Sequence, residues 1–498
     1  MPKGITIVGL GPGAPGLLTI EAQQVLQAAG EIYVRTRRHP TVEALPQSAT
    51  IHSFDEVYER ANTFDEVYAE IASHVVELGK RPQGVVYAVP GHPCVGEASV
   101  QLILTLVKAT DLPVRIVDGI SFVEPVCTSL QLDPLIGLQI ADATALATHH
   151  YPEFNPDLPV LIGQLYNREL AADVKLVLMV VYPDEHPITL ICAAGTPAES
   201  LRTMPLYELD RCAEIDHLTS LYVPPLAQPS SVSAFQEVVA RLRAPDGCPW
   251  DREQTHSSLR PFLLEETYEV LQALDRDDME LLKEELGDLL LQILLHTQIA
   301  IEGGEFKMAD VVGHIVAKLK RRHPHVFGDV KVANSREVMV NWERIKSAER
   351  LALRRAEEAH PAQGKGDRQH EESALKDVPK AMPALARAQS LQRRAAHAGF
   401  DWPDVKSVSA KVEEEWKKLR EDMAEEVRAA ELGNLMFSLV ALARWLDVDA
   451  ESALREATAR FERHFKDIER ECAIRGQSLS DLKFQRDALC KQPKKETG

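Results

Sequence analysis

Two short acidic segments most constrain how this 498-residue chain can fold. The first is Glu265-Glu266-x-x-Glu269, and the second is Glu285-x-x-Asp288. On a helix, the first three carboxylates fall within an arc of about 100° and the second two lie about 60° apart. So much negative charge in one place is unfavourable unless a cation joins it. We expect two antiparallel helices whose carboxylates face one another around Mg²⁺ or Mn²⁺.

The second acidic segment borders an apolar helical stripe made of Leu282, Leu286, Leu289 and Ile293. A solvated acidic face is therefore a weaker explanation than a metal site at the edge of a core. A turn near Asp275–Asp277, with a capping box from Asp277 to Glu280, would join the two helices. Counted from this turn, the level pairs across the hairpin are Glu269 with Glu285 and Glu266 with Asp288.

Residues 246–346 carry further motifs around these helices: Gly247–Asp251, Leu264–Glu269, Glu284–Leu289, Arg321–Gly328 and Asn341–Glu343. This set resembles the MazG family of nucleoside triphosphate pyrophosphohydrolases. The resemblance implies an all-α fold that hydrolyses a nucleoside triphosphate (NTP) to a nucleoside monophosphate (NMP) and pyrophosphate with Mg²⁺. The metal ligands that it implies are Glu266, Glu269, Glu285 and Asp288.

Other side chains of this segment have candidate roles in the same reaction. Glu265 either orients the attacking water or is an outward-facing surface residue. A basic helix end either contacts the phosphates or complements the helix dipole; its residues are Lys318, Arg321 and Arg322. Trp250 would stack on the base, with Asp251 and Gln254 reading the base edge. Secondary candidates are Trp342 and Lys346, whereas loop structure is the expected role of His323 and His325.

The composition of the whole chain limits the partners that it can bind. Its formal net charge of −19 argues against a general nucleic-acid or anionic-membrane binder. No apolar run reaches bilayer-spanning length, and the first residues lead into a strand and not into a signal peptide. The seven cysteines are scattered without a C-x-x-C pair. We therefore expect a cytoplasmic enzyme with reduced thiols.

Two hydrophobic patterns divide the chain into domains. Residues 1–225 alternate short β-rich runs with helical stretches, and Leu176–Val181 is one of the expected strands. Pro224-Pro225 marks a boundary, beyond which the pattern is helical. Charged and polar residues around Gly364–Gly366 predict a linker over 351–383. We expect a multidomain fold, with an α/β domain at 1–225 and all-α domains at 226–350 and 384–490.

The second all-α segment is a degenerate repeat of the first, which pairs Glu285–Leu291 with Glu431–Phe437 and Leu264–Glu269 with Glu413–Lys418. Lys418 and Asn434 each replace a carboxylate of the first copy. By the same level pairing, Lys418 would face Glu431, and Asn434 would face Glu415. We expect a structural, metal-free copy in which an ammonium group takes the place of Mg²⁺.

A glycine-rich turn, Gly9–Gly13, follows the first strand of the N-terminal domain. Its glycines let the backbone come close to a ligand, and Thr19 fits the N-cap of the next helix. The turn is not a P-loop, because no Gly-Lys-Ser/Thr follows. A Rossmann interpretation needs an acidic residue after the second strand, where Arg35–Arg38 stands, so NADP binding stays an alternative.

The turn is followed in order by Val89–Pro93, Asp118–Ser121 and Gln139–Asp142. Over residues 3–225 this series resembles the tetrapyrrole (corrin/porphyrin) methylases. The resemblance implies a homodimer that binds S-adenosylmethionine between two α/β lobes. The cofactor-binding positions that it implies are Gly9, Gly11, Pro12, Gly13, Gly91, His92, Pro93 and Ser121. His92 stands where the family has an aspartate, and it is either a polar group near the ligand or a spacer.

The whole chain therefore resembles a bacterial fusion of a tetrapyrrole methylase with a MazG domain. We expect an NTP pyrophosphohydrolase joined to a domain that binds S-adenosylmethionine. Its expected partners are nucleoside triphosphates and a tetrapyrrole or other methyl acceptor, with no nucleic acid and no membrane. Two alternatives stay open. One is a tetrapyrrole-type methyltransferase whose helical part dimerises, and the other is an N-terminal ligand sensor that regulates the hydrolase.

Overall fold

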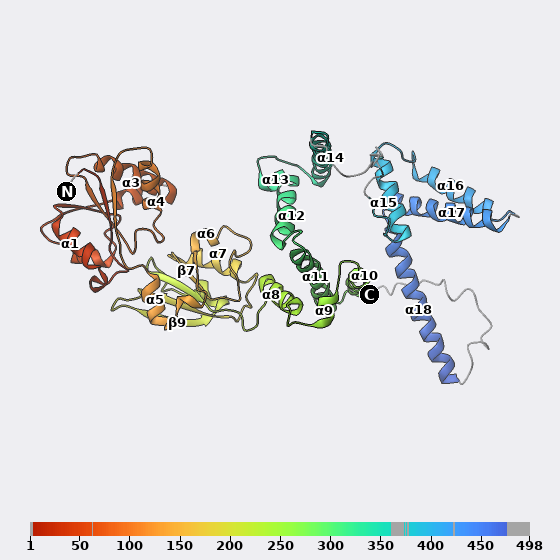
Figure 1. Ribbon diagram of the computed structural model, residues 1–498, viewed down its shortest axis with the longest axis horizontal. Helices are drawn as coiled ribbons and strands as arrows, with labels where there is room; N and C mark the ends of the chain where they lie inside the picture. Colours follow the sequence, from red (N-terminus) through yellow and green to blue (C-terminus); the bar gives the residue numbers. More distant parts are fainter. Residues whose placement is uncertain are drawn as a thin grey trace. The chain divides into compact units, whose positions relative to one another are not determined.

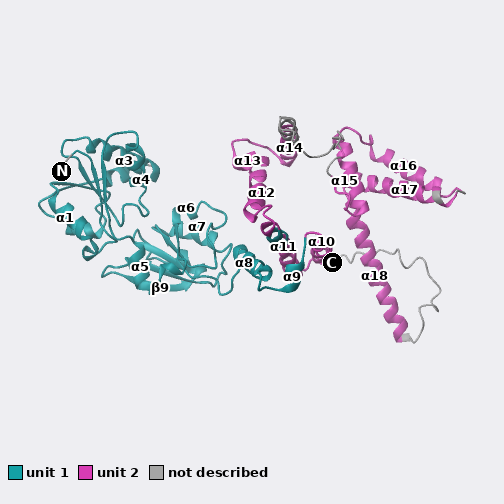
Figure 2. Cartoon of the chain, viewed as in Figure 1, with its two compact units in different colours: residues 1–255, 294–299 teal, residues 256–293, 300–498 magenta. Residues whose placement is uncertain are grey.

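The structure, a computed structural model, describes residues 3–61, 63–359, 373, 375, 378–421 and 424–475. The chain divides into two compact units, residues 1–255 with 294–299 and residues 256–293 with 300–498 (Figure 2). Every described strand lies in the first unit, whereas the regular structure described in the second unit is helical (Figure 1). The expected multidomain fold, α/β followed by all-α, is confirmed.

A parallel sheet forms the first lobe of the first unit. Its strands are β1 (Ile5–Gly9), β2 (Glu31–Val34), β3 (Thr50–Ser53), β4 (Val85–Val89) and β5 (Val114–Val117), in the order β3-β2-β4-β1-β5. Its helices are α1 (Ile20–Ala28), α2 (Asp55–Arg60), α3 (Phe64–Gly79) and α4 (Ala98–Val107). All five residues of β4 are buried, because separate apolar clusters cover the two faces of the sheet.

A mixed sheet forms the second lobe. Its strands are β6 (Gln139–Asp142), β7 (Val160–Gly163), β8 (Pro187–Cys192), β9 (Ser200–Pro205) and β10 (Thr219–Val223), in the order β6-β7-β10-β8-β9. Its helices are α5 (Val123–Leu130), α6 (Ala143–Leu146) and α7 (Arg168–Leu178). The strand expected at Leu176–Val181 is wrong, because α7 continues to Leu178. The buried side chains of α7, such as Val174, pack into the core of this sheet.

Helices make up the regular structure that the chain shows beyond β10. They are α8 (Val232–Arg243), α9 (Pro249–Glu253), α10 (Arg260–Arg276), α11 (Met279–Glu302), α12 (Met308–Arg322), α13 (Pro324–Phe327), α14 (Ser335–Ala359), α15 (Ala384–His397), α16 (Val405–Leu419), α17 (Glu425–Trp445) and α18 (Ala450–Arg475). None of the described helices combines the length and the hydropathy needed to cross a bilayer. Helix α14 runs into the start of the predicted linker, and residues 360–372 and 476–490 of the predicted segments lie outside the described residues.

The expected hairpin of acidic helices is present. Helix α10 ends at Arg276, and Asp277 takes the left-handed conformation with φ +55°. The expected capping box is wrong by one residue, because the carboxylate of Asp278 accepts a hydrogen bond from the Leu281 amide at 3.1 Å. Asp277 cannot serve as this cap, since it already forms the left-handed end of the preceding helix.

Candidate functional site

The two acidic helices bring three carboxylates together. Glu266 on α10 and Glu285 and Asp288 on α11 each place one oxygen within 4.8 Å of the other two. Glu266 and Glu285 are half-buried, and Asp288 is exposed. Three hard oxygen donors at this separation can surround one divalent cation, which the sequence predicted from their spacing.

Mutual repulsion perturbs these carboxylates. Partial burial raises the pKa of Glu266, and the charges of Asp288 and Glu269 raise it further. Partial burial also raises the pKa of Glu285, with Glu269 as the largest charge contributor. The charge of Asp288 therefore raises the pKa of Glu266, and the charge of Glu269 raises that of Glu285. Both effects agree with the expected level pairs across the hairpin. The donor set and its uncompensated negative charge fit a divalent metal ion.

Glu265, the fifth carboxylate, is exposed at the surface of α10. Its charge contributes to the raised pKa of Glu266, so it lies near the cluster without belonging to the group of three. Both roles expected for Glu265, water orientation and surface exposure, are compatible with this position.

The basic end of α12 is largely occupied by one carboxylate. Glu349 on α14 accepts hydrogen bonds from Arg321 and from Arg322, at 2.5 Å and 2.7 Å respectively. Sequence reasoning missed Glu349, because it lies 27 positions after Arg322 and only helix packing brings the two together. Lys318 is half-buried on the same helix and has no ion pair among the described residues.

Two further candidates lie on α14. Trp342 is half-buried, its indole Nε1 has no hydrogen-bond partner among the described residues, and its ring centroid lies 6.4 Å from that of His323. Lys346 is half-buried one turn further along. The ring Nδ1 of His323 donates a hydrogen bond to the carbonyl of Leu319 at 2.8 Å, which agrees with a role in loop structure.

Trp250, Asp251 and Gln254 lie in the first unit, on or next to α9. Trp250 is 53% exposed. The side-chain amide of Gln254 donates to the Trp250 carbonyl at 3.0 Å, and Arg243 donates to the Gln254 carbonyl at 3.2 Å. These bonds fix the turn that carries the tryptophan.

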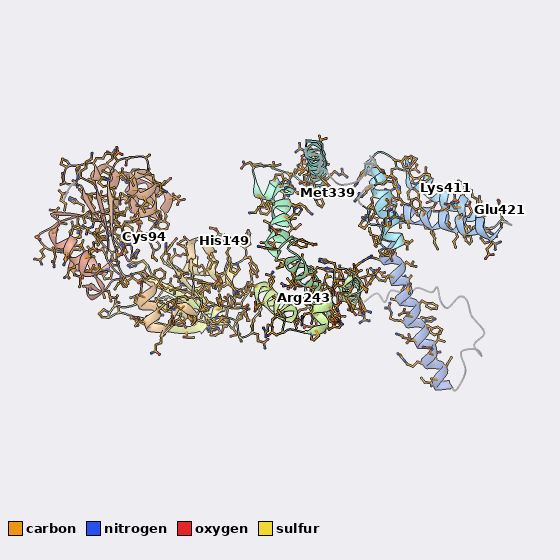
Figure 3. All side chains as sticks on the ribbon, in the orientation of Figure 1. Cys94, His149, Arg243, Met339, Lys411 and Glu421 are labelled. Atoms are coloured by element: carbon orange, nitrogen blue, oxygen red, sulfur yellow. The ribbon has the colours of Figure 1, made fainter. Side chains whose placement is uncertain are left out.

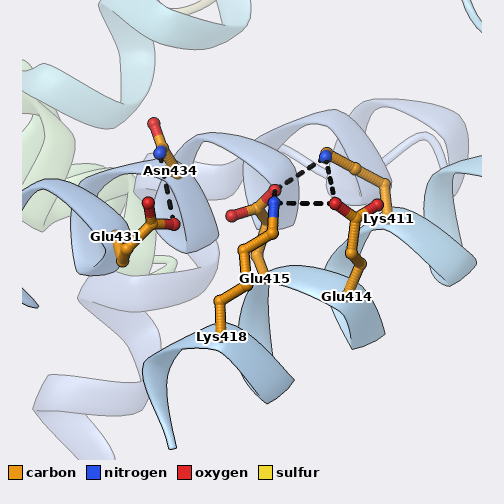
Figure 4. A network of polar contacts seen from close by, with 6 residues as sticks. All are labelled: Lys411, Glu414, Glu415, Lys418, Glu431 and Asn434. Atoms are coloured by element: carbon orange, nitrogen blue, oxygen red, sulfur yellow. Dashed lines mark hydrogen bonds and ion pairs between the residues drawn. The ribbon is translucent and has the colours of Figure 1, made fainter. Parts of the chain in front are cut away.

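In the degenerate copy, lysine ammonium groups lie among the carboxylates (Figure 4). Lys418 contacts Glu414 at 2.7 Å and Glu415 at 3.1 Å. Lys411 contacts the same two carboxylates, at 2.9 Å and 2.7 Å. The pKa of Glu415 falls to about 2, because hydrogen bonds from both lysines favour its charged form. Charge is thus balanced within the copy, as the sequence predicted for Lys418.

The expected partners of this copy are nevertheless wrong. Lys418 turns back to carboxylates of its own helix, and the side-chain amide of Asn434 donates to Glu431 on its own helix at 3.4 Å. Lys411 was missed, because its counterpart in the first copy is the uncharged Phe262. Lys411 lies on α16, about two turns before Lys418, and is labelled in Figure 3.

In the first unit, three loops meet at the carboxyl ends of the neighbouring strands β4, β1 and β5. Gly11 and Gly91 exchange backbone hydrogen bonds of 3.2 Å and 2.8 Å. A Cβ on Gly9 would lie 2.6 Å from the Gly91 carbonyl oxygen and 2.7 Å from Gly119. Only glycine permits this approach. The predicted segments Gly9–Gly13 and Gly91–Pro93 therefore come together, beside the loop that leads to Ser121.

The polar side chains of these loops bind one another. His92 Nδ1 accepts from the amide of Cys94 at 3.0 Å (Cys94 is labelled in Figure 3), and His92 Nε2 lies 3.5 Å from Asp118. The hydroxyl of Ser121 donates to Glu124 at 2.5 Å and accepts from Val123. His92 thus lies between two loops, whereas Ser121 shapes its own loop.

Comparison with known proteins agrees with both halves of this structure. The model of the tetrapyrrole (corrin/porphyrin) methylases matches residues 4–210, and that of the MazG nucleotide pyrophosphohydrolase domain matches residues 254–327. The uncharacterized protein YabN of Bacillus subtilis is 40% identical over 494 residues, which cover 97% of each chain. The chain belongs to the YabN family of methylase–MazG fusions.

Relatives that match only one half of the chain agree with this assignment. The nucleoside triphosphate pyrophosphohydrolase of Escherichia coli K12 is 43% identical over 259 residues, which are 51% of this chain and 92% of the relative. The uroporphyrinogen-III C-methyltransferase of Cyanidium caldarium is 27% identical over 202 residues, which are 38% of this chain and 78% of the relative. The family predicted from the motifs is confirmed, while the roles of single site residues stay predictions.

Proposed function

We propose that the first MazG copy hydrolyses nucleoside triphosphates to nucleoside monophosphates and pyrophosphate. One observation carries this proposal: Glu266, Glu285 and Asp288 converge within 4.8 Å inside the segment that the MazG family model matches. The fourth ligand is Glu269, whose charge reaches Glu285. These carboxylates would hold Mg²⁺ or Mn²⁺, which would supply positive charge to neutralise phosphate oxygens and to activate water.

The remaining side chains bind and orient the nucleotide. Water attacks the α-phosphorus, the bond from that phosphorus to the bridging oxygen breaks, and pyrophosphate leaves with the bond's electron pair. Glu265 orients this water from the exposed side of α10. Lys318 and the basic end of α12 contact the phosphates. Trp250 stacks on the base, and Asp251 and Gln254 form hydrogen bonds with the edge of the base. Trp342 and Lys346 have secondary roles in nucleotide binding.

A panel of NTPs and deoxy-NTPs with Mg²⁺ tests this activity. We expect equimolar NMP and pyrophosphate, measured by ion-exchange chromatography, and no product when the metal is chelated. Release of a diphosphate and inorganic phosphate would show cleavage at the wrong bond and would refute the proposal.

We further propose that the first unit binds S-adenosylmethionine where the loops after β1, β4 and β5 meet. The close approach of Gly9, Gly11 and Gly91 leaves backbone groups near a ligand, and the methylase family match supports this choice. The proposed methyl acceptor is a tetrapyrrole or another compound. Calorimetry on the full chain with S-adenosylmethionine, S-adenosylhomocysteine and NADP tests this proposal. Binding of NADP alone would favour the Rossmann alternative.

The sensor alternative has a separate readout. If the first unit senses its ligand without chemistry, S-adenosylmethionine changes the rate of NTP hydrolysis and no methylated product forms. If the methylase is active, labelled methyl groups pass to an acceptor.

We also propose a cytoplasmic homodimer. The free state of six described cysteines supports a reducing compartment; they are Cys94, Cys127, Cys192, Cys212, Cys248 and Cys472. An exposed apolar stripe on α12 supports self-association; it consists of Val312, Ile315, Val316 and Leu319.

A further inference from the structure

Glu349 accepts a different number of hydrogen bonds from each of its two arginine partners. Arg322 donates from both Nε and Nη2, at 3.2 Å and 2.7 Å, to one oxygen of the carboxylate. Arg321 donates only from Nε, at 2.5 Å, to the other oxygen. Each oxygen of Glu349 is therefore committed to one guanidinium group.

The two guanidinium groups also differ in exposure. The side chain of Arg322 is 17% exposed and that of Glu349 is 16%, so this pair forms the buried part of the contact. The side chain of Arg321 is 53% exposed, and its Nη1 and Nη2 have no partner among the described residues. Arg321 is thus anchored at one edge, and its other edge stays open.

The contact joins two helices that carry predicted nucleotide-binding residues. Trp342 and Glu349 are seven residues apart, so they lie on the same face of α14. Trp342 on this face approaches His323, just beyond the end of α12, and Glu349 reaches the last turn of α12. Two adjacent arginines lower the pKa of Glu349 to about 2, through hydrogen bonds and charge, so the carboxylate is ionised at neutral pH.

We propose that Glu349 is a positioning residue for hydrolysis: it holds Arg321 by Nε, so that the two terminal amino groups face the phosphates of the nucleotide. Arg322 is held more fully, because it donates two hydrogen bonds to Glu349, and it also secures α14 against α12. The inference rests on the proposed pyrophosphohydrolase function and adds a residue to it. It also separates two arginines that the sequence could not distinguish.

The contact between Glu349 and Arg321 should affect nucleotide binding more than the rate of the hydrolytic step. A guanidinium group that is held before the nucleotide arrives loses less side-chain freedom on binding. Without Glu349, Arg321 must be ordered by the nucleotide itself, so the KM for NTP rises. The kcat changes little, since the metal-binding carboxylates stay in place.

Three variants test the proposal in the full chain, with initial rates of pyrophosphate release and thermal unfolding as readouts. Glu349→Gln should raise the KM about tenfold and leave kcat within about twofold. Arg321→Lys keeps the charge but loses Nε, so it should raise the KM similarly. Arg322→Lys should lower the melting temperature more than it raises the KM. Glu280→Gln, which breaks an exposed ion pair with Lys283, is the matched control and should change neither parameter.

A double variant tests the coupling directly. Because Glu349 acts through Arg321, the variant with Glu349→Gln and Arg321→Lys should have a KM no higher than that of the worse single variant. An unchanged KM for a folded Glu349→Gln would overturn the proposal, and so would a lowered KM, which would show that the carboxylate competes with phosphates. If Glu349→Gln does not fold, Arg321→Lys decides: an unchanged KM overturns the proposal. Turnover by the unmodified chain reports separately on the proposed function.

Discussion

At the scale of single residues, electrostatic partners decide what each carboxylate can do. Glu266 and Glu285 face like charges, and their pKa values rise. Glu415, the counterpart of Glu266, faces Lys411 and Lys418, and its pKa falls to about 2. The same position in the two copies thus leaves negative charge available for a metal ion in one and consumes it in the other.

Buried His39 makes stability depend on pH. Burial lowers its pKa to about 4, and the charges of Arg35 and His217 act in the same direction. The unfolded chain takes up this proton below about pH 6.5, and the native chain does so only near pH 4. The free energy of unfolding should therefore rise with pH between these values, by up to about 1.4 kcal/mol per pH unit.

The variant His39→Gln isolates this effect. Chemical denaturation at pH 4.5, 5.5 and 6.5 should show a smaller pH slope for His39→Gln than for the unmodified chain. His149→Gln, on a histidine whose side chain is 38% exposed, is the control and should keep the full slope. Equal slopes for all three proteins would mean that His39 does not carry the dependence.

The candidate site shows what spacing in a sequence can and cannot predict. The convergence of Glu266, Glu285 and Asp288 was predictable, because helical periodicity and one turn fix their faces. Glu349 was not predictable, since its contact depends on how α14 packs. Lys418 was assigned the wrong partner because its long flexible side chain reaches carboxylates of its own helix.

At the scale of elements, α10 with α11 and α16 with α17 are the same hairpin with different charge. Four of the five acidic positions of the first hairpin lie close together, whereas the second keeps three acidic residues and adds two lysines. A bound cation would relieve the repulsion between the helices of the first hairpin, whereas the second hairpin has ammonium groups of its own. The hairpin fold is therefore compatible with both a catalytic and a structural use.

Lys418→Ala tests the structural role of the second hairpin. Loss of this ammonium leaves Glu415, whose side chain is 4% exposed, with Lys411 as its remaining cation, which should lower the free energy of unfolding modestly because Lys418 itself is partly exposed. We expect a melting temperature a few degrees lower and unchanged NTP hydrolysis. The neighbouring exposed Lys417→Ala is the control. A loss of hydrolysis with a stable fold would mean that the second copy takes part in catalysis.

The apolar stripe of α12 tests the proposed homodimer. Ile315→Glu places a charge in the middle of this exposed stripe, where burial against a second chain would be unfavourable. Light scattering should show the mass of a monomer for Ile315→Glu and of a dimer for Lys320→Glu on the same helix. An unchanged mass for Ile315→Glu would place the interface elsewhere.

At the scale of the whole molecule, an α/β unit and a helical unit follow one another in a single chain. Short apolar strands and glycine turns predicted the first, and helical periodicity with an internal repeat predicted the second. The α7 region was misassigned because its apolar end, Leu176–Val181, has the composition of a buried strand. Only packing against the mixed sheet shows that Val174 and Val177 belong to a helix face.

The central claim is that the first acidic hairpin is the hydrolytic centre. It is tested most directly by Mg²⁺-dependent pyrophosphate release from Glu269→Gln and Asp288→Asn, beside the exposed control Glu280→Gln. Loss of one ligand should lower turnover roughly a hundredfold or more, with the fold intact by circular dichroism, and the control should keep its rate. Near-normal turnover in a folded Asp288→Asn or Glu269→Gln variant would contradict the account.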